Sequence, residues 1–292
     1  MNPDKETPIN RLGMYLYMLL LYLLSLPVQL FCAENELLGS AELYTEKSFT
    51  YGRFVVRMRM AAADGVISSF FLWKQGSEAV EVDGTTWNEI DIEVLGCSPA
   101  GFQSALHCGK GGWSAMKHRE EYHRVKKNLC THYNTYSVEW TPDYIAWTLN
   151  DSLVRKDTGD MVAAFRNVPM QLRFNIWPSL NPAWAGLFKK ENLPKHQYIN
   201  SVKYYTYTPG SDSGFTLAWE DDFGADTLDA RWRTGFWESP DRASTHTDKN
   251  ITLMNGVAIL TLSIFTECGF RGLIPQDDQG GTTLPKGFGR GR

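Results

Sequence analysis

The sequence has few cysteines and no excess of positive charge. Its 292 residues include five cysteines, too few for a scaffold held together by disulfides, and the odd number leaves at least one thiol unpaired. Lysine and arginine number 29 against 33 aspartates and glutamates, a formal charge of −4. Because nucleic-acid binders need a basic surface to displace counterions from phosphates, this balance argues against that class. With 43% hydrophobic residues, the chain can bury a sizeable core.

Long helical periodicity is also missing, and so is any internal repeat. Instead, Phe54, Val56, Met58 and Met60 fall on one face of segment 51–60 and arginines on the other, the period-two signature of a half-buried strand. Similar short runs recur at 133–140, 144–149, 153–155, 171–177, 200–207, 215–219 and 257–265. Many short strands separated by turns predict an all-β fold, a sandwich of the jelly-roll type with two curved antiparallel sheets.

The first 33 residues have the order of a signal peptide. Lys5 and Arg11 precede an almost unbroken run of Leu, Tyr and Met from Leu12 to Leu26, and Ala33 is a small residue that could end the signal. This order predicts a secreted, extracellular protein. The alternative is an uncleaved membrane anchor, since the apolar stretch approaches the ~20 residues that span a bilayer.

The rest of the chain is predicted to form one domain and a tail. We expect residues 34–276 to form the jelly-roll domain, with a linker at 208–214 that is rich in Gly, Pro and Ser. Residues 277–292 are rich in Gly and polar residues and predict a flexible tail. The charged run at 117–127 predicts a solvated loop. We expect the protein to be a monomer.

One strand-like segment, residues 87–96, carries three acids. Alternation puts Glu89, Asp91 and Glu93 on one face and the aliphatic residues between them on the other. Three neighbouring acids repel each other and add nothing to folding, which favours a catalytic role. The alternative is a solvated strand face or a charged edge that prevents aggregation.

The spacing of the outer two acids fits retaining glycoside hydrolysis. Positions four apart on a strand lie about 13 Å apart, and side chains that lean together on a concave sheet would bring the carboxyl groups to about 5 Å. Retaining glycosidases have that separation, whereas inverting enzymes need ~6.5–9.5 Å for a water. One Glu would be ionised for attack and the other protonated for the leaving oxygen, while Asp91 would tune both pKa values.

Residues 89–96, Glu-Ile-Asp-Ile-Glu-Val-Leu-Gly, resemble the active-site strand of glycoside hydrolase family sixteen, the β-jelly-roll endoglucanases. The resemblance implies that Glu89 is the nucleophile, Asp91 the assisting carboxylate and Glu93 the acid/base. The spacing without an extra residue is similar to that of lichenases and xyloglucan transglycosylases. Further segments that resemble lichenases lie at 41–45, 51–54, 102–104, 138–142 and 173–177.

The order of segments resembles that of circularly permuted 1,3-1,4-β-glucanases from rumen bacteria. Residues 215–237 look like the opening strands of ordinary family members, yet here they follow the acid strand and the 208–214 linker. Permutation costs little when the original termini lie close together on a sandwich surface. The resemblance therefore implies a permuted strand order.

The same resemblance implies a sugar-binding cleft. Aromatic rings present flat apolar faces to sugar rings, while Arg, Asn and Gln form hydrogen bonds with hydroxyls. Without the resemblance, core packing would be the favoured explanation for each tryptophan. The implied binding residues are Phe71, Trp73, Gln103, Arg173, Asn175, Trp177, Trp184 and Trp237.

Asn200, Asp222 and Gly256 match the calcium site of the permuted enzymes, and oxygen ligands suit Ca²⁺. The ion would tie the relocated strands together, and we expect no cofactor for the chemistry itself. The alternative is that these are three ordinary turn residues. The four histidines between residues 107 and 132 show no spacing typical of a metal site.

The sequence thus leads us to expect a secreted retaining endo-hydrolase of β-1,4 linkages in mixed-linkage 1,3-1,4-β-D-glucans such as lichenan and cereal β-glucan. Two alternatives stay open. One is a transglycosylase on β-glucan or xyloglucan, in which an acceptor sugar replaces water. The other is a jelly roll that binds carbohydrate without cleaving it.

Overall fold

A computed structural model describes residues 37–77, 85–239 and 242–277. The predicted signal peptide (1–33) and the predicted tail beyond Asp277 lie outside these described residues. Within them, no helix is both long enough and apolar enough to cross a membrane.

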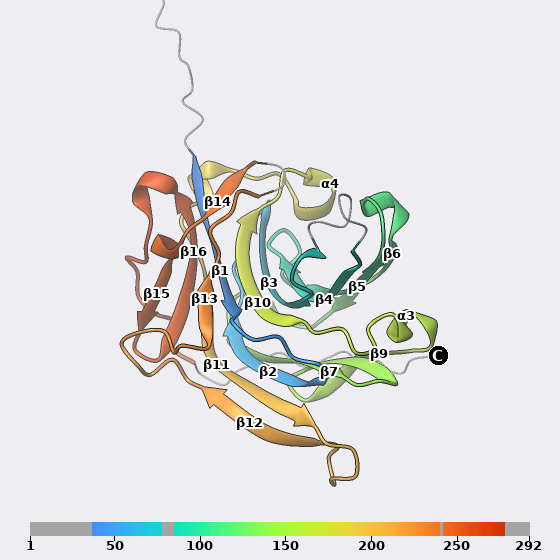
Figure 1. Ribbon diagram of the computed structural model, residues 1–292. Helices are drawn as coiled ribbons and strands as arrows, with labels where there is room; N and C mark the ends of the chain where they lie inside the picture. Colours follow the sequence, from blue (N-terminus) through green and yellow to red (C-terminus); the bar gives the residue numbers. More distant parts are fainter. Residues whose placement is uncertain (1–36, 78–84, 240–241, 278–292) are drawn as a thin grey trace, which may run out of the picture. The chain divides into compact units, whose positions relative to one another are not determined.

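The described chain is all β, as predicted, and its ladders are antiparallel except for the parallel pair β1–β14 (Figure 1). The strands are β1 Leu38–Thr45, β2 Gly52–Arg59, β3 Val66–Trp73, β4 Trp87–Leu95, β5 Gly101–Gly109, β6 Lys117–Arg124, β7 Asn134–Trp140, β8 Tyr144–Leu149, β9 Ser152–Thr158, β10 Gln171–Pro178, β11 Lys195–Tyr207, β12 Phe215–Asp221, β13 Trp232–Thr234, β14 Ser244–His246, β15 Ile251–Met254 and β16 Val257–Ile264. The α-helices are short: α3 spans Asp160–Ala163 and α4 spans Pro182–Ala185.

Two curved layers form the sandwich of a jelly roll. One layer has the order β6–β5–β4–β3–β10–β1, the other has the order β11–β2–β7–β8–β9, and β16 joins β1 to β11. Figure 1 shows the first layer curving away from the second, so that its face opposite the core is concave, with α4 on that side.

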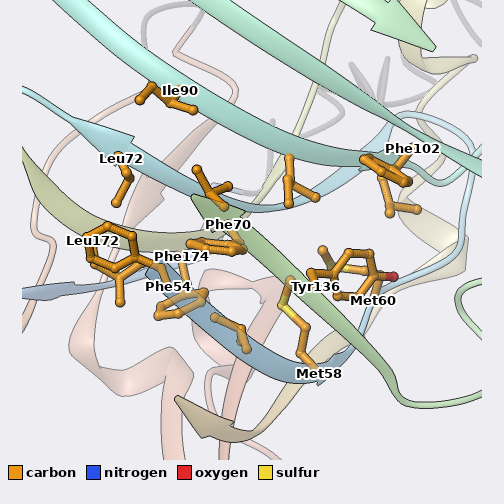
Figure 2. Close-up of a cluster of buried hydrophobic side chains, with 14 of the residues drawn as sticks. Phe54, Met58, Met60, Phe70, Leu72, Ile90, Phe102, Tyr136, Leu172 and Phe174 are labelled. Carbon is orange, nitrogen blue, oxygen red and sulfur yellow. The ribbon is translucent and has the colours of Figure 1, made fainter. Parts of the chain in front are cut away.

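The core lies between the layers and follows from alternation along the strands. On β2, Phe54, Val56 and Met58 are fully buried, as the period-two pattern predicts. They face Phe70 of β3 and Phe174 of β10, whose rings stack at 5.6 Å (Figure 2). Burying a large apolar side chain contributes ~1.5–3 kcal/mol, so this seam stabilises the two layers together.

Two hydrogen bonds cross the core and fix β4, which carries the three acids, and its neighbour β3 to the second layer. The indole N–H of Trp147 on β8 donates to the backbone carbonyl of Asp91 on β4 at 3.0 Å. The side-chain amide of Gln197 on β11 donates to the carbonyl of Ser69 on β3 at 2.9 Å. Buried polar groups are costly when unpaired, so these bonds hold β3 and β4 in place.

Three details differ from or sharpen the sequence analysis. The charged run at 117–127 is not a loop over its first part: residues 117–124 form β6, which lies at the end of the sheet and is almost wholly exposed. Charges on such an edge strand prevent pairing with other molecules.

The 208–214 segment is a tight hairpin loop between β11 and β12, closed by a 2.8 Å bond from the N–H of Thr208 to the carbonyl of Gly214. Cys97, Cys108 and Cys130 form no bridge, and all three are free thiols.

Candidate active site

The strand register brings the three acids onto one face of the first layer. Ile90, Ile92 and Val94 of β4 are fully buried in the core, so the acids between them point to the concave face. Partners opposite one another in an antiparallel ladder share a face. Glu89 lies between Trp73 of β3 and His107 of β5.

The same register extends the face across the neighbouring strands. Asp91 lies opposite Phe71, which lies opposite Arg173 of β10. Glu93 lies opposite Gln103 of β5. In the same way Ser69, on the other side of Glu93, pairs with Asn175, and Ile67 pairs with Trp177.

The last two of the expected binding residues come from outside these strands. Trp184 lies in α4, where its indole N–H donates to the side-chain oxygen of Gln103 at 3.1 Å and its ring lies 6.0 Å from that of Trp177. Trp237 donates its indole N–H to Glu42 of β1 at 2.7 Å. The structure therefore brings all eight expected residues to the concave face.

The tryptophans divide between this face and the core. Trp140, Trp147 and Trp232 are buried in the core at 2% exposure or less, whereas Trp237 is 38% exposed. Trp73, Trp177 and Trp184 are partly exposed on the concave face. Core packing thus accounts for the first group, and the second group is available to a ligand.

Arg173 is held in place on the concave face by Trp73, which the sequence analysis named, and by Glu42 and Tyr44, which it missed. Its guanidinium donates to Glu42 at 3.0 Å and lies 4.3 Å from the ring of Trp73 and 4.6 Å from that of Tyr44. Glu42 is itself buried and also accepts the Trp237 bond. Glu42 and Tyr44 lie on β1, and Glu42 is 131 positions away from Arg173 in the sequence. No local spacing therefore reveals these contacts.

Two further neighbours distinguish the acids from one another. The indole N–H of Trp87 donates to Glu89 at 2.8 Å. His107 contacts Asp91, with 3.3 Å between Nε2 and Oδ2. Alternation alone could have found Trp87, since positions 87 and 89 share a face. His107 becomes a neighbour only through the β4–β5 register.

Burial raises the pKa of all three acids. It raises the pKa of Glu89 to about 7, against the Trp87 hydrogen bond and the positive charge of Arg173, which both lower it. It raises the pKa of Glu93 to about 8, reinforced by the negative charges of Glu89 and Glu120. Burial and the two flanking glutamates raise the pKa of Asp91 well above its usual range.

The surroundings of the two outer glutamates differ. Glu89 has both a hydrogen-bond donor and a nearby cation that stabilise its ionised form. Among the described residues, Glu93 has neither, and only like charges act on it besides burial. A carboxylate that ionises first suits nucleophilic attack, and one that keeps its proton suits acid catalysis.

The expected calcium residues meet at the junction of β11, β12 and β16. Val202 pairs with Asp221, and Ile199 pairs with Ala258, so Asn200 lies beside the segments that hold Asp222 and Gly256. A Cβ atom on Gly256 would lie 3.5 Å from the carbonyl oxygen of Asp222. Asn200 donates its amide to Asp277 at 2.8 Å, which leaves its carbonyl oxygens for other partners. Carboxylate and carbonyl oxygens, such as these three residues carry, are the kind of ligand that Ca²⁺ prefers.

Comparison with known proteins identifies the family. The sequence pattern of glycosyl hydrolases family 16 matches residues 27–192. A β-glucanase from Fibrobacter succinogenes is 44% identical over 245 residues, which cover 82% of this chain and 68% of that protein. The chain belongs to glycosyl hydrolase family 16.

Other family 16 members match a shorter part. A β-glucanase from Brevibacillus brevis is 32% identical over 167 residues, covering 56% of this chain and 60% of that protein. The solved structure of Bacillus licheniformis β-glucanase aligns with a TM-score of 0.47 at 23% identity, over 57% of this chain and 76% of that one.

Proposed function

We propose that this family 16 protein is a retaining endo-β-glucanase that hydrolyses β-1,4 linkages in mixed-linkage 1,3-1,4-β-D-glucan. The observation that carries the proposal is the pair of glutamates on one face of β4, with the Trp87 indole N–H bonded to Glu89. The name of the Fibrobacter relative supports β-glucan as the substrate.

The reaction would run in two steps. The ionised carboxylate of Glu89 attacks the anomeric carbon, and Glu93 donates its proton to the departing glycosidic oxygen. The bond from carbon to that oxygen breaks, and a glycosyl ester of Glu89 forms. Glu93, now ionised, takes a proton from water, and the resulting hydroxide displaces Glu89 with a second inversion. The products are two shorter glucans, and both glutamates return to their starting states.

Asp91 would link the protonation states of Glu89 and Glu93. It lies between the glutamates, its backbone is held by Trp147, and its carboxyl group is 3.3 Å from His107. Burial and the charges of both glutamates raise the pKa of Asp91, so Asp91 keeps a proton that it can share with whichever neighbouring glutamate is ionised.

The aromatic and polar residues of the concave face would hold the glucan. The rings of Trp73, Trp177 and Trp184 offer apolar surfaces for the C–H faces of glucosyl units. Arg173, Asn175 and Gln103 offer hydrogen bonds to hydroxyls. Asn175 already accepts a short bond from the hydroxyl of Ser69, which fixes the orientation of its amide.

We also propose a permuted strand order with a structural Ca²⁺ bound by Asn200, Asp222 and Gly256. Family 16 matches only residues 27–192, whereas the Fibrobacter relative aligns over 245 residues. The carbonyl of Leu37 accepts a 2.8 Å bond from the N–H of Phe265, so these two segments lie side by side. Permutation with little loss of stability requires ends that are close in this way. Moving residues 215–265 ahead of residue 37 should then give a folded protein.

Secretion as a monomer is a further part of the proposal, based on the basic–apolar–small order of the first 33 residues. N-terminal sequencing and mass measurement of protein recovered from the medium test it. Removal of the first 33 residues supports it, and an intact N-terminus in the membrane fraction contradicts it.

The enzymatic test is a substrate panel of barley glucan, lichenan, laminarin, cellulose and xyloglucan, assayed with wild type and Glu89→Gln. We expect wild type to release reducing ends from barley glucan and lichenan, with the β-anomer formed first by NMR. Glu89→Gln should lose at least about 10³-fold in kcat, since the nucleophile is missing. Glu121→Gln, a carboxylate change on the outer strand β6, is the matched control and should stay active.

Three outcomes would contradict the proposal. Products longer than the starting glucan, formed without new reducing ends, would indicate a transglycosylase. Glucan binding without any cleavage would indicate a binding module. An α-anomer as first product would indicate inversion and would remove the nucleophile role of Glu89.

A further inference from the structure

Two histidines and a glutamate gather beside the acids on strands β5 and β6, which lie next to each other in Figure 1. His107 of β5 lies directly opposite His118 of β6, and Glu120 follows two positions after His118 on the same face. One nitrogen of each histidine and a carboxylate oxygen of Glu120 all lie within 4.8 Å of one another. The proposed glycosidase mechanism gives no role to the side chains of His118 and Glu120.

The hydrogen bonds fix which nitrogens face each other. His118 Nε2 lies 2.7 Å from the backbone carbonyl oxygen of Trp113, which can only accept, so this nitrogen carries a hydrogen. His107 Nε2 lies 3.3 Å from a carboxyl oxygen of Asp91. The Nδ1 atoms of the two rings lie 2.8 Å apart. When both Nε2 atoms carry the hydrogen, both Nδ1 atoms present lone pairs to the space between the rings, the arrangement that a metal ion needs.

We propose that His107 Nδ1, His118 Nδ1 and the Glu120 carboxylate bind a divalent transition-metal ion such as Zn²⁺. Imidazole and carboxylate ligands suit Zn²⁺, Ni²⁺ and Cu²⁺, whereas Ca²⁺ takes oxygen ligands. The site is therefore chemically distinct from the calcium site at Asn200, Asp222 and Gly256. The competing arrangement is a direct hydrogen bond between the two Nδ1 atoms.

The dimensions of the cluster suit such an ion. Zn²⁺ binds nitrogen and oxygen at ~2.0–2.2 Å in a tetrahedron, which sets ligand atoms about 3.4 Å apart. The two Nδ1 atoms at 2.8 Å need only a small outward rotation. Glu120 needs to close in by up to about 1.4 Å, and its side chain and that of His118 are exposed. Ala105 lies opposite Glu120 in the ladder and leaves room for this.

The neighbours of the two histidines match the outer shell of protein zinc sites. A metal-bound histidine typically donates its other ring N–H to a carboxylate or a backbone carbonyl, which fixes the tautomer and ring orientation. His107 has Asp91 in that position and His118 has the Trp113 carbonyl. The indole of Trp113 packs on both imidazoles, at 4.8 and 4.2 Å, and restricts their rotation.

Calorimetric titration of the full chain with ZnCl₂ tests the site, in neutral buffer that contains CaCl₂ after removal of bound metals. We expect one Zn²⁺ per chain, with affinity at least about tenfold weaker in His118→Ala and in Glu120→Gln. His132→Ala and Glu121→Gln are the matched controls outside the cluster and should bind as wild type does. Circular dichroism confirms that each variant is folded.

Two results of this titration would contradict the proposed metal site. No Zn²⁺ binding by wild type would overturn the proposed site. Binding that persists unchanged in both His118→Ala and Glu120→Gln would place the ion elsewhere. Because the readout is binding heat, neither result depends on whether the protein cleaves β-glucan.

Discussion

The indole of Trp87 and the carboxylate of Glu89 stand two positions apart on β4 and are joined by a 2.8 Å hydrogen bond. Side chains at such positions share a face of the strand, so the bond is local and depends on no distant contact. It lowers the pKa of Glu89 against the burial that raises it. Together with the nearby charge of Arg173, this donor distinguishes Glu89 from the equally buried Glu93.

Trp87→Phe should therefore shift the acidic limb of the activity profile to higher pH. The variant keeps an aromatic ring against Trp73 and loses only the N–H donor to Glu89. A hydrogen bond to a charged group contributes ~1.5–3 kcal/mol, so we expect a shift of about one pH unit in kcat/KM. Trp113→Phe is the control, because the Trp113 ring lies 6.0 Å from that of Trp87 but the hydrogen bond to Glu89 comes from the Trp87 indole. An unmoved acidic limb would contradict the role given to Trp87.

The full pH profile of kcat/KM for wild type should be a bell with its maximum between about 7 and 8. Glu89 must be ionised, so activity rises as pH passes through its pKa of about 7. Glu93 must be protonated, so activity falls as pH passes through its pKa of about 8. The two limbs belong to the interacting carboxyl groups as a set. A maximum below pH 6 would show that burial does not raise these pKa values.

Glu42→Gln should move the acidic limb the opposite way from Trp87→Phe. The negative charge of Glu42 raises the pKa of Glu89, and its removal also leaves Arg173 freer to lower it. The change breaks a buried ion pair in which Glu42 is 1% exposed, at a cost of ~3 kcal/mol or less since glutamine keeps one acceptor. We expect the melting temperature to fall by up to about 10 °C. Opposite shifts in the two variants, measured on the same substrate, identify Glu89 as the group that titrates on that limb.

The sequence predicted the face of β4 correctly because alternation is a local property. Ile90 and Ile92 are fully buried, and the acids between them point away from the core. Strand β6 was missed for the converse reason. Its side chains are exposed on both faces except His123, so no apolar alternation marks it, and only pairing with β5 makes it a strand.

The neighbours of the acids were largely beyond sequence reasoning. Glu42 and Arg173 are 131 positions apart, and His107 and His118 are 11 apart on two strands. Their contacts depend on which strands pair and in what register, and that choice is made by packing across the whole sandwich. The resemblance to family 16 supplied eight binding residues that alternation alone could not, yet it did not point to Glu42 or His107.

Removal of Ca²⁺ should lower stability without changing the chemistry. Asn200, Asp222 and Gly256 lie where β11, β12 and β16 meet, far along the chain from the acids of β4. A ligand that binds only the folded state at 100 times its Kd stabilises by ~2.7 kcal/mol, which is about 5–10 °C for a domain of this size. We expect EGTA to lower the melting temperature by that amount, while kcat at low temperature stays unchanged. Adding excess Ca²⁺ should restore the melting temperature and Mg²⁺ should not, since Mg²⁺ demands a tighter octahedral site. Because Zn²⁺ is not added back, restoration by Ca²⁺ alone assigns the stabilisation to the oxygen site, and a melting temperature that EGTA leaves unmoved would remove that site from the proposal.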